Sequence, residues 1–297
     1  MATREKPVHC LSFDVEEHFQ VSAFWSEERR QQWDRYESRV EGNTRKLGEI
    51  LAQHGTKATF FVLGWVAERY PNLVKDLAGE GHEIASHGFG HELVSSMRPE
   101  EFRRDVRRAK GVLEDLIGKE VLGYRAPSFS INAETPWALS ILVEEGHQYD
   151  SSVYNRFQRS HVSASNGNPY SIETNAGMIL EVPPSTMSLL GFRMPVAGGG
   201  YFRLLPYELS KWCLDRLEQR GAQLVVYLHP WEIDPGQPRM AGPWSSQFRH
   251  YLNLEKTQGR LEQLLIDFRF GPIVEVAAAA RMAFQRPNHL MSLRPTS

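Results

Sequence analysis

Two histidines with the spacing of metal ligands, His87 and His91, lie in the segment Ser86-His87-Gly88-Phe89-Gly90-His91. Neutral imidazole is the commonest metal-ligating side chain. A spacing of four lets both rings point the same way if the chain turns helically after His87. Catalytic zinc usually takes about three protein ligands and keeps one position open. An isolated pair of this kind also arises by chance or on a solvated helix face, so a metal site requires a further ligand from elsewhere.

The acidic cluster Asp14-Val15-Glu16-Glu17-His18 directly follows a mostly apolar run, residues 8–13, which predicts a buried strand. Side chains two residues apart on an extended segment face the same side, so Asp14 and Glu16 point together. Glu16 is the expected third ligand, with Glu17 as the alternative. The mixed nitrogen and oxygen donors favour Zn²⁺, or another divalent metal such as Co²⁺ or Ni²⁺. Such an ion lowers the pKa of its bound water and polarises a carbonyl group.

Three further residues complete a possible hydrolytic site. Asp14 is placed to take a proton from water as a general base, and Arg125 to pair with it and orient it. His229, which follows another strand, suits the protonation of a leaving group at neutral pH. Together these residues predict metal-assisted hydrolysis of an amide or ester. Taken singly, each has a structural interpretation as a turn residue, a surface ion pair or a hydrogen-bonded loop histidine.

The elements that must position these residues alternate between strands and helices, which predicts an α/β fold with a parallel sheet covered by helices. Working residues of such folds lie where strands end, and each candidate follows a predicted strand. Residues 19–42 are expected to form a long loop and residues 155–177 an irregular insertion. The predicted strands are residues 8–13, 58–63, 83–86, 121–124, 179–182, 224–228 and 273–276, and the predicted helices begin near Asn43, Pro71, Pro99, Pro136 and Pro206.

Composition excludes several classes of protein. Among 297 residues, 34 Lys and Arg nearly balance 36 Asp and Glu, so no nucleic-acid or anionic-membrane partner is predicted. The two cysteines make no disulfide framework. The polar stretch Met1–Pro7 lacks the apolar core of a signal peptide, and no apolar run reaches membrane-spanning length. We therefore expect a cytoplasmic protein without an integral membrane segment, and leave homo-oligomerisation open.

Five ordered segments of the chain resemble the motifs of the polysaccharide deacetylases (carbohydrate esterase family 4, the nodulation-type deacetylase domain). They are Phe13-Asp14-Val15-Glu16, Ser86 to His91, Tyr124-Arg125-Ala126-Pro127-Ser128, Asp150-Ser151-Ser152 and Leu228-His229-Pro230. Ordered motifs are far more specific than any single one. In addition, the stretch from Gly198 to Pro206 resembles the exosortase-associated bacterial branch, which is found with exopolysaccharide biosynthesis genes.

The resemblance implies a distorted (β/α) barrel, a divalent metal and removal of N-acetyl groups from amino-sugar polymers. It implies one catalytic domain over residues 1–297, with a C-terminal extension from about residue 235 packed on the barrel. The family's base corresponds to Asp14, its metal histidines to His87 and His91, its base-orienting arginine to Arg125 and its general acid to His229. The expected partner is a carbohydrate substrate that bears N-acetyl groups.

The chain departs from the family pattern at two motifs. Val15 stands where the family has a metal-binding aspartate, so the ligand shifts to Glu16 or Glu17. Val153-Tyr154 replace the usual Asp-Trp of the fourth motif, so Asp150 or Glu232 must orient His229, or His229 works without such a partner. Two alternatives to the deacetylase remain: a cytosolic amidohydrolase acting on small linear or cyclic amides, and a non-catalytic glycan-binding module.

Overall fold

A nine-stranded sheet lies at the centre of the computed structural model, which describes residues 7–153, 167–189 and 192–285. Its strands run in the order β10-β1-β2-β3-β4-β5-β7-β6, and β11 pairs with β1 as well. All pairings are parallel except that of β6 with β7. The strands are β1 (Val8–Val15), β2 (Thr59–Val62), β3 (Glu83–Ser86), β4 (Gly123–Tyr124), β5 (Tyr149–Asp150), β6 (Tyr170–Thr174), β7 (Gly177–Glu181), β10 (Val225–Leu228) and β11 (Arg269–Gly271).

The sheet curls into a distorted barrel. Beyond β7, the backbone N–H of Ser185 donates to the carbonyl of Val225 in β10 at 3.1 Å. The N–H of Val225 donates in return to the Ser185 hydroxyl oxygen at 2.8 Å. These contacts join the β7 side of the sheet to β10, and β10 pairs with β1. The predicted mixed α/β fold and distorted (β/α) barrel are therefore confirmed.

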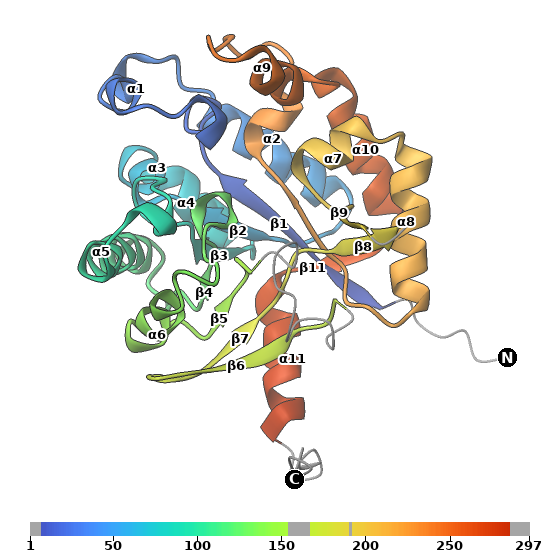
Figure 1. Ribbon diagram of the computed structural model, residues 1–297. Coiled ribbons are helices and arrows are strands. Elements are labelled where there is room, and N and C mark those ends of the chain that lie inside the picture. The colour runs from blue at the N-terminus through green and yellow to red at the C-terminus, as the bar shows by residue number, and fades with distance from the viewer. Residues whose placement is uncertain (1–6, 154–166, 190–191, 286–297) are drawn as a thin grey trace, which may run out of the picture.

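Helices cover the outside of the sheet, with α5 and α6 on one side and α8 and α10 on the other (Figure 1). The central strands are consequently buried on both faces, and all of β1 except Val8 is buried, as expected for parallel strands. The helices are α1 (Glu27–Arg30), α2 (Val40–Gln53), α3 (Gly64–Arg69), α4 (Pro71–Gly79), α5 (Pro99–Ile117), α6 (Trp137–Glu144), α7 (Gly199–Leu204), α8 (Tyr207–Gln219), α9 (Trp244–Tyr251), α10 (Leu254–Asp267) and α11 (Ile273–Gln285). Among the described residues, no helix combines the length and apolar character needed to cross a membrane.

The C-terminal part of the chain differs from the sequence prediction. Residues 273–276 were predicted as a strand but begin helix α11, and the strand is β11, directly before them. β11 pairs with the first residues of β1, from Val8 to Cys10. Ile273 and Ala277 of α11 pack against Cys10 and Phe61. The segment after residue 235 therefore contributes a strand and core residues to the barrel.

Two segments predicted as irregular contain regular structure. Within residues 19–42 lie α1 and two short 3₁₀ helices, Ser22–Phe24 and Trp33–Arg35, and α2 begins at Val40. The insertion predicted for residues 155–177 lies partly outside the described residues, and its later part forms β6 in a hairpin with β7. In the glycine-rich stretch 198–200, Gly198 precedes α7, and Gly199 and Gly200 are its first two residues.

Candidate metal centre and active site

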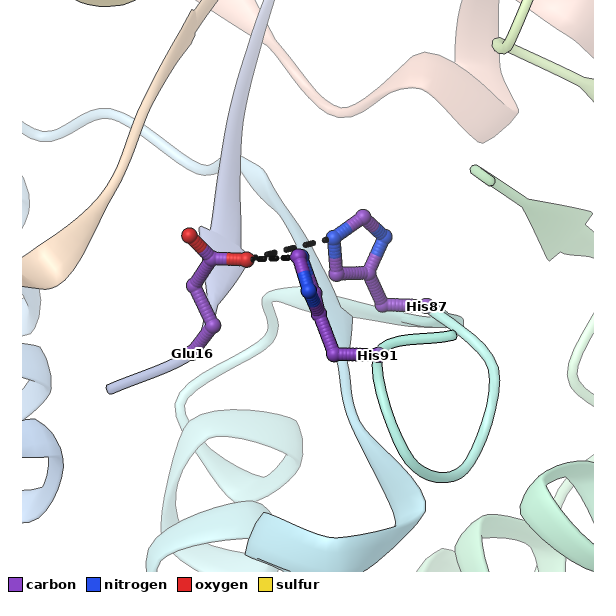
Figure 2. A group of neighbouring side chains, drawn as sticks. All are labelled: Glu16, His87 and His91. Carbon is purple, nitrogen blue, oxygen red and sulfur yellow. Dashed lines mark ion pairs between the residues drawn. The ribbon is translucent and has the colours of Figure 1, made fainter. Parts of the chain in front are cut away.

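Glu16, His87 and His91 converge at the carboxyl ends of β1 and β3 (Figure 2). The Glu16 Oε2 atom lies 3.7 Å from His87 Nε2 and 2.5 Å from His91 Nε2. One ligand atom from each residue lies within 4.8 Å of the others, and all three residues are buried. Two imidazole nitrogens and one carboxylate oxygen are a donor set that zinc takes in proteins. The residues present therefore fit a divalent cation.

The loop after β3 brings the two histidines together without a helical turn. Gly88 has φ +75, and a Cβ atom there would lie 2.8 Å from the Asp105 carboxylate. That carboxylate accepts the backbone N–H of Phe89 at 2.9 Å. His91 itself has φ +50, a left-handed conformation that is uncommon for residues other than glycine. The loop thus returns the chain so that His91 faces His87, which replaces the helical turn predicted from the spacing.

The hydrogen bonds of His87 fix which ring nitrogen is free. Its Nδ1 atom lies 2.8 Å from the carbonyl oxygen of Arg125. A carbonyl oxygen only accepts, so Nδ1 carries the proton and Nε2 directs its lone pair at Glu16. Such a partner on the second nitrogen is the usual arrangement for a metal-ligating histidine. No local sequence pattern indicates this backbone contact, because it joins residues that are far apart along the chain.

The Glu16 carboxylate is held in its charged form despite complete burial. Burial by itself raises the pKa of Glu16, but the nearby imidazoles of His91 and His229 outweigh it and hold the pKa well below its usual value. The indole N–H of Trp231 also donates to Glu16 Oε1 at 3.3 Å. A charged, partly satisfied carboxylate beside two imidazoles is suited to ligate a cation.

Glu17, the alternative ligand, has a different position. Its carboxylate accepts the backbone N–H of Arg39 at 3.1 Å and the hydroxyl of Ser38. Arg39 precedes the first residue of α2, so Glu17 caps the start of that helix. The structure therefore brings Glu16, and not Glu17, to the histidines.

Asp14 and Arg125 form a buried ion pair next to this cluster. The Arg125 Nη1 atom lies 2.7 Å from Asp14 Oδ1. The same guanidinium donates to the Ser12 hydroxyl at 2.9 Å and to the hydroxyl and carbonyl of Ser151 at 2.9 and 3.2 Å. It also stacks over the Phe61 ring at 4.1 Å. Arg125 is thus fixed by several donors and orients the Asp14 carboxylate toward the cluster.

His229 approaches the same cluster from the end of β10. Its Nε2 atom lies 3.8 Å from both Asp14 Oδ2 and Glu16 Oε1. Its Nδ1–H donates to Glu232 Oε1 at 2.7 Å, and the ring stacks on Trp231. Burial lowers the pKa of His229, but the carboxylates of Glu16, Glu232 and Asp14 outweigh it and raise the pKa to about 9. Without a bound cation, His229 is therefore protonated at neutral pH.

Glu232, and not Asp150, is the partner of His229. Glu232 is fully buried and also pairs with the guanidinium of Arg203 at 2.6 Å. Burial raises its pKa, but Arg203 and His229 outweigh this and lower it. Asp150 instead accepts the Ser152 hydroxyl at 2.5 Å. Sequence reasoning missed the role of Arg203, whose only sign was a charged residue in the otherwise uncharged stretch from Gly198 to Leu205.

A cavity of about 220 Å³ opens onto these residues, so a small substrate group can reach them from solvent. The site residues that line it are Asp14, Glu16, His87, His91, His229 and Trp231. The site residues predicted from the sequence therefore lie together in the structure. They are Asp14, Glu16, His87, His91, Arg125 and His229. Comparison with known proteins adds independent information on this arrangement.

Residues 31–148 match the family described as polysaccharide deacetylase. This part of the chain is therefore similar to polysaccharide deacetylases. Residues 151–278 match a second family, described as a domain of unknown function (DUF3473). The deacetylase match includes His87, His91 and Arg125, whereas His229 and its partners lie in the second match. Asp14 and Glu16 precede both matches, so the site combines the two matched regions with the segment before them.

Several of the relatives matched in sequence are named as deacetylases. A peptidoglycan-N-acetylglucosamine deacetylase of Bacillus cereus is 40% identical over 75 residues, which cover 25% of this chain and 27% of the relative. A chitooligosaccharide deacetylase of Azorhizobium caulinodans is 35% identical over 80 residues, which cover 27% of this chain and 38% of the relative. The chain thus spans well under half of the length of these relatives.

Solved structures share the fold of the whole chain. A Mycobacterium smegmatis protein assigned to the polysaccharide deacetylases superposes with a TM-score of 0.64 at 20% identity, covering 100% of this chain and 98% of that one. The PuuE allantoinase superposes with a TM-score of 0.60 at 15% identity, covering 95% and 96%. At these identities the likeness concerns the barrel, including its C-terminal strand and helices.

Proposed function

We propose that this chain is a metal-dependent hydrolase that removes N-acetyl groups from N-acetylhexosamine units of a polysaccharide or its precursor. The main support is the convergence of Glu16, His87 and His91 beside the Asp14–Arg125 pair and His229, in a chain whose residues 31–148 match the polysaccharide deacetylase family. We place the reaction in exopolysaccharide biosynthesis on the resemblance of residues 198–206 to the exosortase-associated branch.

Glu16, His87 and His91 would hold Zn²⁺, or Co²⁺ or Ni²⁺ in its place. Such an ion supplies Lewis acidity, which lowers the pKa of water and polarises the amide carbonyl. The protein's own part is to present three donor atoms of the right kind on two strand ends. The Nδ1–H bond from His87 to the Arg125 carbonyl keeps the donor nitrogen in place.

Asp14 is the general base in this mechanism. One of its oxygens is engaged by Arg125 at 2.7 Å, while the other faces the site, 3.8 Å from His229 Nε2. The free oxygen takes a proton from the attacking water as the new C–O bond forms at the acetyl carbon. Arg125 holds the carboxylate in one orientation during this step, and its burial excludes competing solvent contacts.

His229 is the general acid, since breaking the C–N bond requires a proton on the leaving amine. Its Nδ1–H is bound to Glu232, so the Nε2–H points into the cavity. Glu232 is in turn fixed by Arg203. The result is an acetate ion and a free amino sugar, with the proton for the nitrogen delivered by His229.

Release of acetate from N-acetylhexosamine oligomers by the metal-loaded protein tests the proposal. We expect turnover by the natural sequence and a loss of at least about 100-fold in kcat for Asp14→Asn, because a positioned base contributes that much or more. Asp115→Asn, at an exposed position of α5, is the matched control and should keep full activity. Absence of acetate across a broad glycan panel with metal bound would refute the proposal. Unchanged glycan binding by Asp14→Asn in an otherwise inactive protein would instead identify a binding module.

A further inference from the structure

A second, larger cavity of about 650 Å³ adjoins the metal centre. The two cavities share Ser128, Phe129, Gly200, Tyr227 and Arg249 in their linings, so they lie side by side. A volume of several hundred Å³ is typical of sites for small organic ligands. It far exceeds what the methyl group of an acetyl substituent needs. The metal centre thus lies at one end of a longer binding region.

The lining of this second cavity is mostly apolar. Ile131 and Val153 are almost fully buried at its wall, whereas Leu204 and Phe248 are 52% and 50% exposed at the surface. The apolar and aromatic lining residues are Phe129, Ile131, Ala133, Val153, Pro195, Tyr201, Leu204, Tyr227, Phe248 and Leu252. Ser128, Asn132, Tyr201, Tyr227 and Arg249 bring polar side-chain groups to this lining, and its other side chains are apolar. A hydrocarbon chain gains free energy from burial in such surroundings.

The boundary between the two cavities carries a positive charge. Arg249 of α9 lines both cavities, and among the described residues its guanidinium pairs with no carboxylate. Among the described residues that line the apolar cavity, Arg249 is the only lysine or arginine. An anion located between a sugar at the metal centre and a chain in the apolar cavity would therefore meet an unpaired cation.

The backbone at the same boundary is held in an uncommon conformation. Ser128 and Phe129 have φ +53 and +55, in the left-handed region, although neither is glycine. This conformation is strained for residues other than glycine, and such residues cluster at active sites and ligand-binding sites. The conformation places the Phe129 ring edge-on to Tyr227, with 4.9 Å between the ring centroids, where both residues line both cavities.

We propose that the natural substrate is an N-acetylated amino sugar joined through a phosphate group to a long apolar chain. The sugar occupies the metal centre, the phosphate meets Arg249 and the chain fills the apolar cavity. This inference rests on the proposed deacetylase function and names its substrate class: a lipid-linked precursor and not the finished polysaccharide. The shared lining of the two cavities, the apolar character of the larger one and the position of Arg249 between them carry the inference.

Binding of simple alkyl phosphates to the full-length chain tests the cavity without any amide chemistry. Each buried methylene group tightens binding by about fourfold, and decyl phosphate has about eight more of them than ethyl phosphate. Burial of only three of these groups already makes decyl phosphate bind about 60-fold more tightly, which calorimetry measures. Equal affinity for the two compounds overturns the proposal. Because neither compound contains an acetyl group, this result does not depend on whether the protein is a deacetylase.

Substitutions at Leu204 and Arg249 test where the chain and the phosphate of the ligand bind. Leu204→Glu should weaken decyl phosphate binding at least about tenfold, because it puts a carboxylate at the cavity mouth. Ile266→Glu is the control, since Ile266 lies at a 65% exposed position of α10, and it should leave decyl phosphate binding unchanged. Arg249→Gln should weaken decyl phosphate binding but not that of decyl glucoside, which has no charge. Equal losses of decyl phosphate affinity in the Leu204 and Ile266 variants would contradict the placement of the chain in the apolar cavity. Equal losses of affinity for the two ligands in the Arg249 variant would contradict the placement of the phosphate at Arg249.

Deacetylation then separates the two proposals. Decyl-phosphate-linked N-acetylglucosamine should give a kcat/KM at least about tenfold above that of N-acetylglucosamine 1-phosphate. Turnover of both compounds without this preference, or a preference for longer sugar oligomers, overturns the substrate class while the deacetylase remains. Chain-dependent binding without acetate release from any compound rejects the deacetylase but keeps the apolar site.

Discussion

The buried Arg203–Glu232 pair is open to a direct energetic test. Glu232 accepts from Arg203 through one oxygen and from His229 through the other. Arg203 is 2% exposed and Glu232 is fully buried, and the guanidinium also donates to the carbonyls of His250 and Leu252 at 2.7 and 3.0 Å. Glu232→Gln leaves the Arg203 guanidinium buried without a counter-ion, and Arg203→Met leaves the buried Glu232 carboxylate with His229 as its remaining cationic partner. Three variants are informative: Arg203→Met, Glu232→Gln and the two combined.

Removing one member of a buried ion pair costs about 3–5 kcal/mol of folding free energy, because the remaining charge stays desolvated. We expect losses in this range for both single variants. The combined variant leaves no unpaired charge, so its loss should fall short of the sum of the single losses by about 2–3 kcal/mol. Urea unfolding followed by circular dichroism gives all three values. Losses that add to within about 0.5 kcal/mol would show that the two side chains are independent and refute the argument.

The same variants affect His229 in opposite directions. Glu232 is one of the carboxylates that raise the pKa of His229 to about 9, so Glu232→Gln should lower that pKa. Arg203→Met removes a cation and keeps the Glu232 carboxylate, so this variant should not lower the pKa of His229. NMR titration of the His229 ring in metal-free protein measures both. A fall of similar size in both variants would indicate general disruption instead of positioning by Glu232.

Three further predictions concern other parts of the molecule. Burial, followed by the charge of Lys110, lowers the pKa of His147 from 6.5 to about 3. The folded state thus binds fewer protons than the unfolded state between these pKa values, and stability is lost as the pH falls through 6.5. Between pH 7 and 5 this loss is about 2 kcal/mol, and His147→Phe should remove it from urea unfolding curves. Gly88→Ala should lower the unfolding free energy by at least about 1 kcal/mol and weaken metal affinity, because Gly88 has a positive φ and lies against Asp105. Gly111→Ala, in the open interior of α5, should instead raise the unfolding free energy by about 0.5–1 kcal/mol. Equal effects of the two substitutions would contradict this explanation. Zn²⁺ at 100 times its Kd should raise the unfolding free energy by about 2.7 kcal/mol, and addition of a chelator should reverse this increase. If Zn²⁺ leaves the melting temperature of the protein unchanged, the folded chain has no ion site of this kind.

Much of the site follows from local patterns. The apolar run before Asp14 and the short strand before His87 indicate where two strands end, and parallel strands end on one rim. The structure bears this out for β1, β3 and β10, whose carboxyl ends carry Asp14, His87 and His229. Spacing alone therefore brings these residues to one edge of the sheet.

Other features depend on contacts that no local pattern reveals. The choice between Glu16 and Glu17 is decided by Arg39, whose backbone N–H binds Glu17 at the start of α2. The choice between Asp150 and Glu232 is decided by the capping geometry of His229, which brings Glu232 back to its ring. Each choice rests on a hydrogen bond whose geometry only the folded chain provides.

The misassigned strand at residues 273–276 has a physical explanation. A short apolar run reads equally well as a buried strand or as the start of a buried helix, since its periodicity is not resolved over four residues. Pairing with β1 is taken by Arg269–Gly271 instead. Ile273 can then begin α11, and its backbone N–H donates to the Thr59 hydroxyl at 2.7 Å. Tertiary pairing, and not local propensity, decides the boundary.

Metal content of matched variants tests the central claim most directly. Glu16 and Glu17 are adjacent buried carboxylates, but only Glu16 faces His87 and His91. Purified protein dialysed against Zn²⁺ should hold about one ion per chain by mass spectrometry of the metal. Glu17→Gln, which keeps the capping oxygen, should retain this ion, and Glu16→Gln should lose most of it. An ion-free natural protein, or equal metal content in the two variants, would contradict a metal centre built on Glu16.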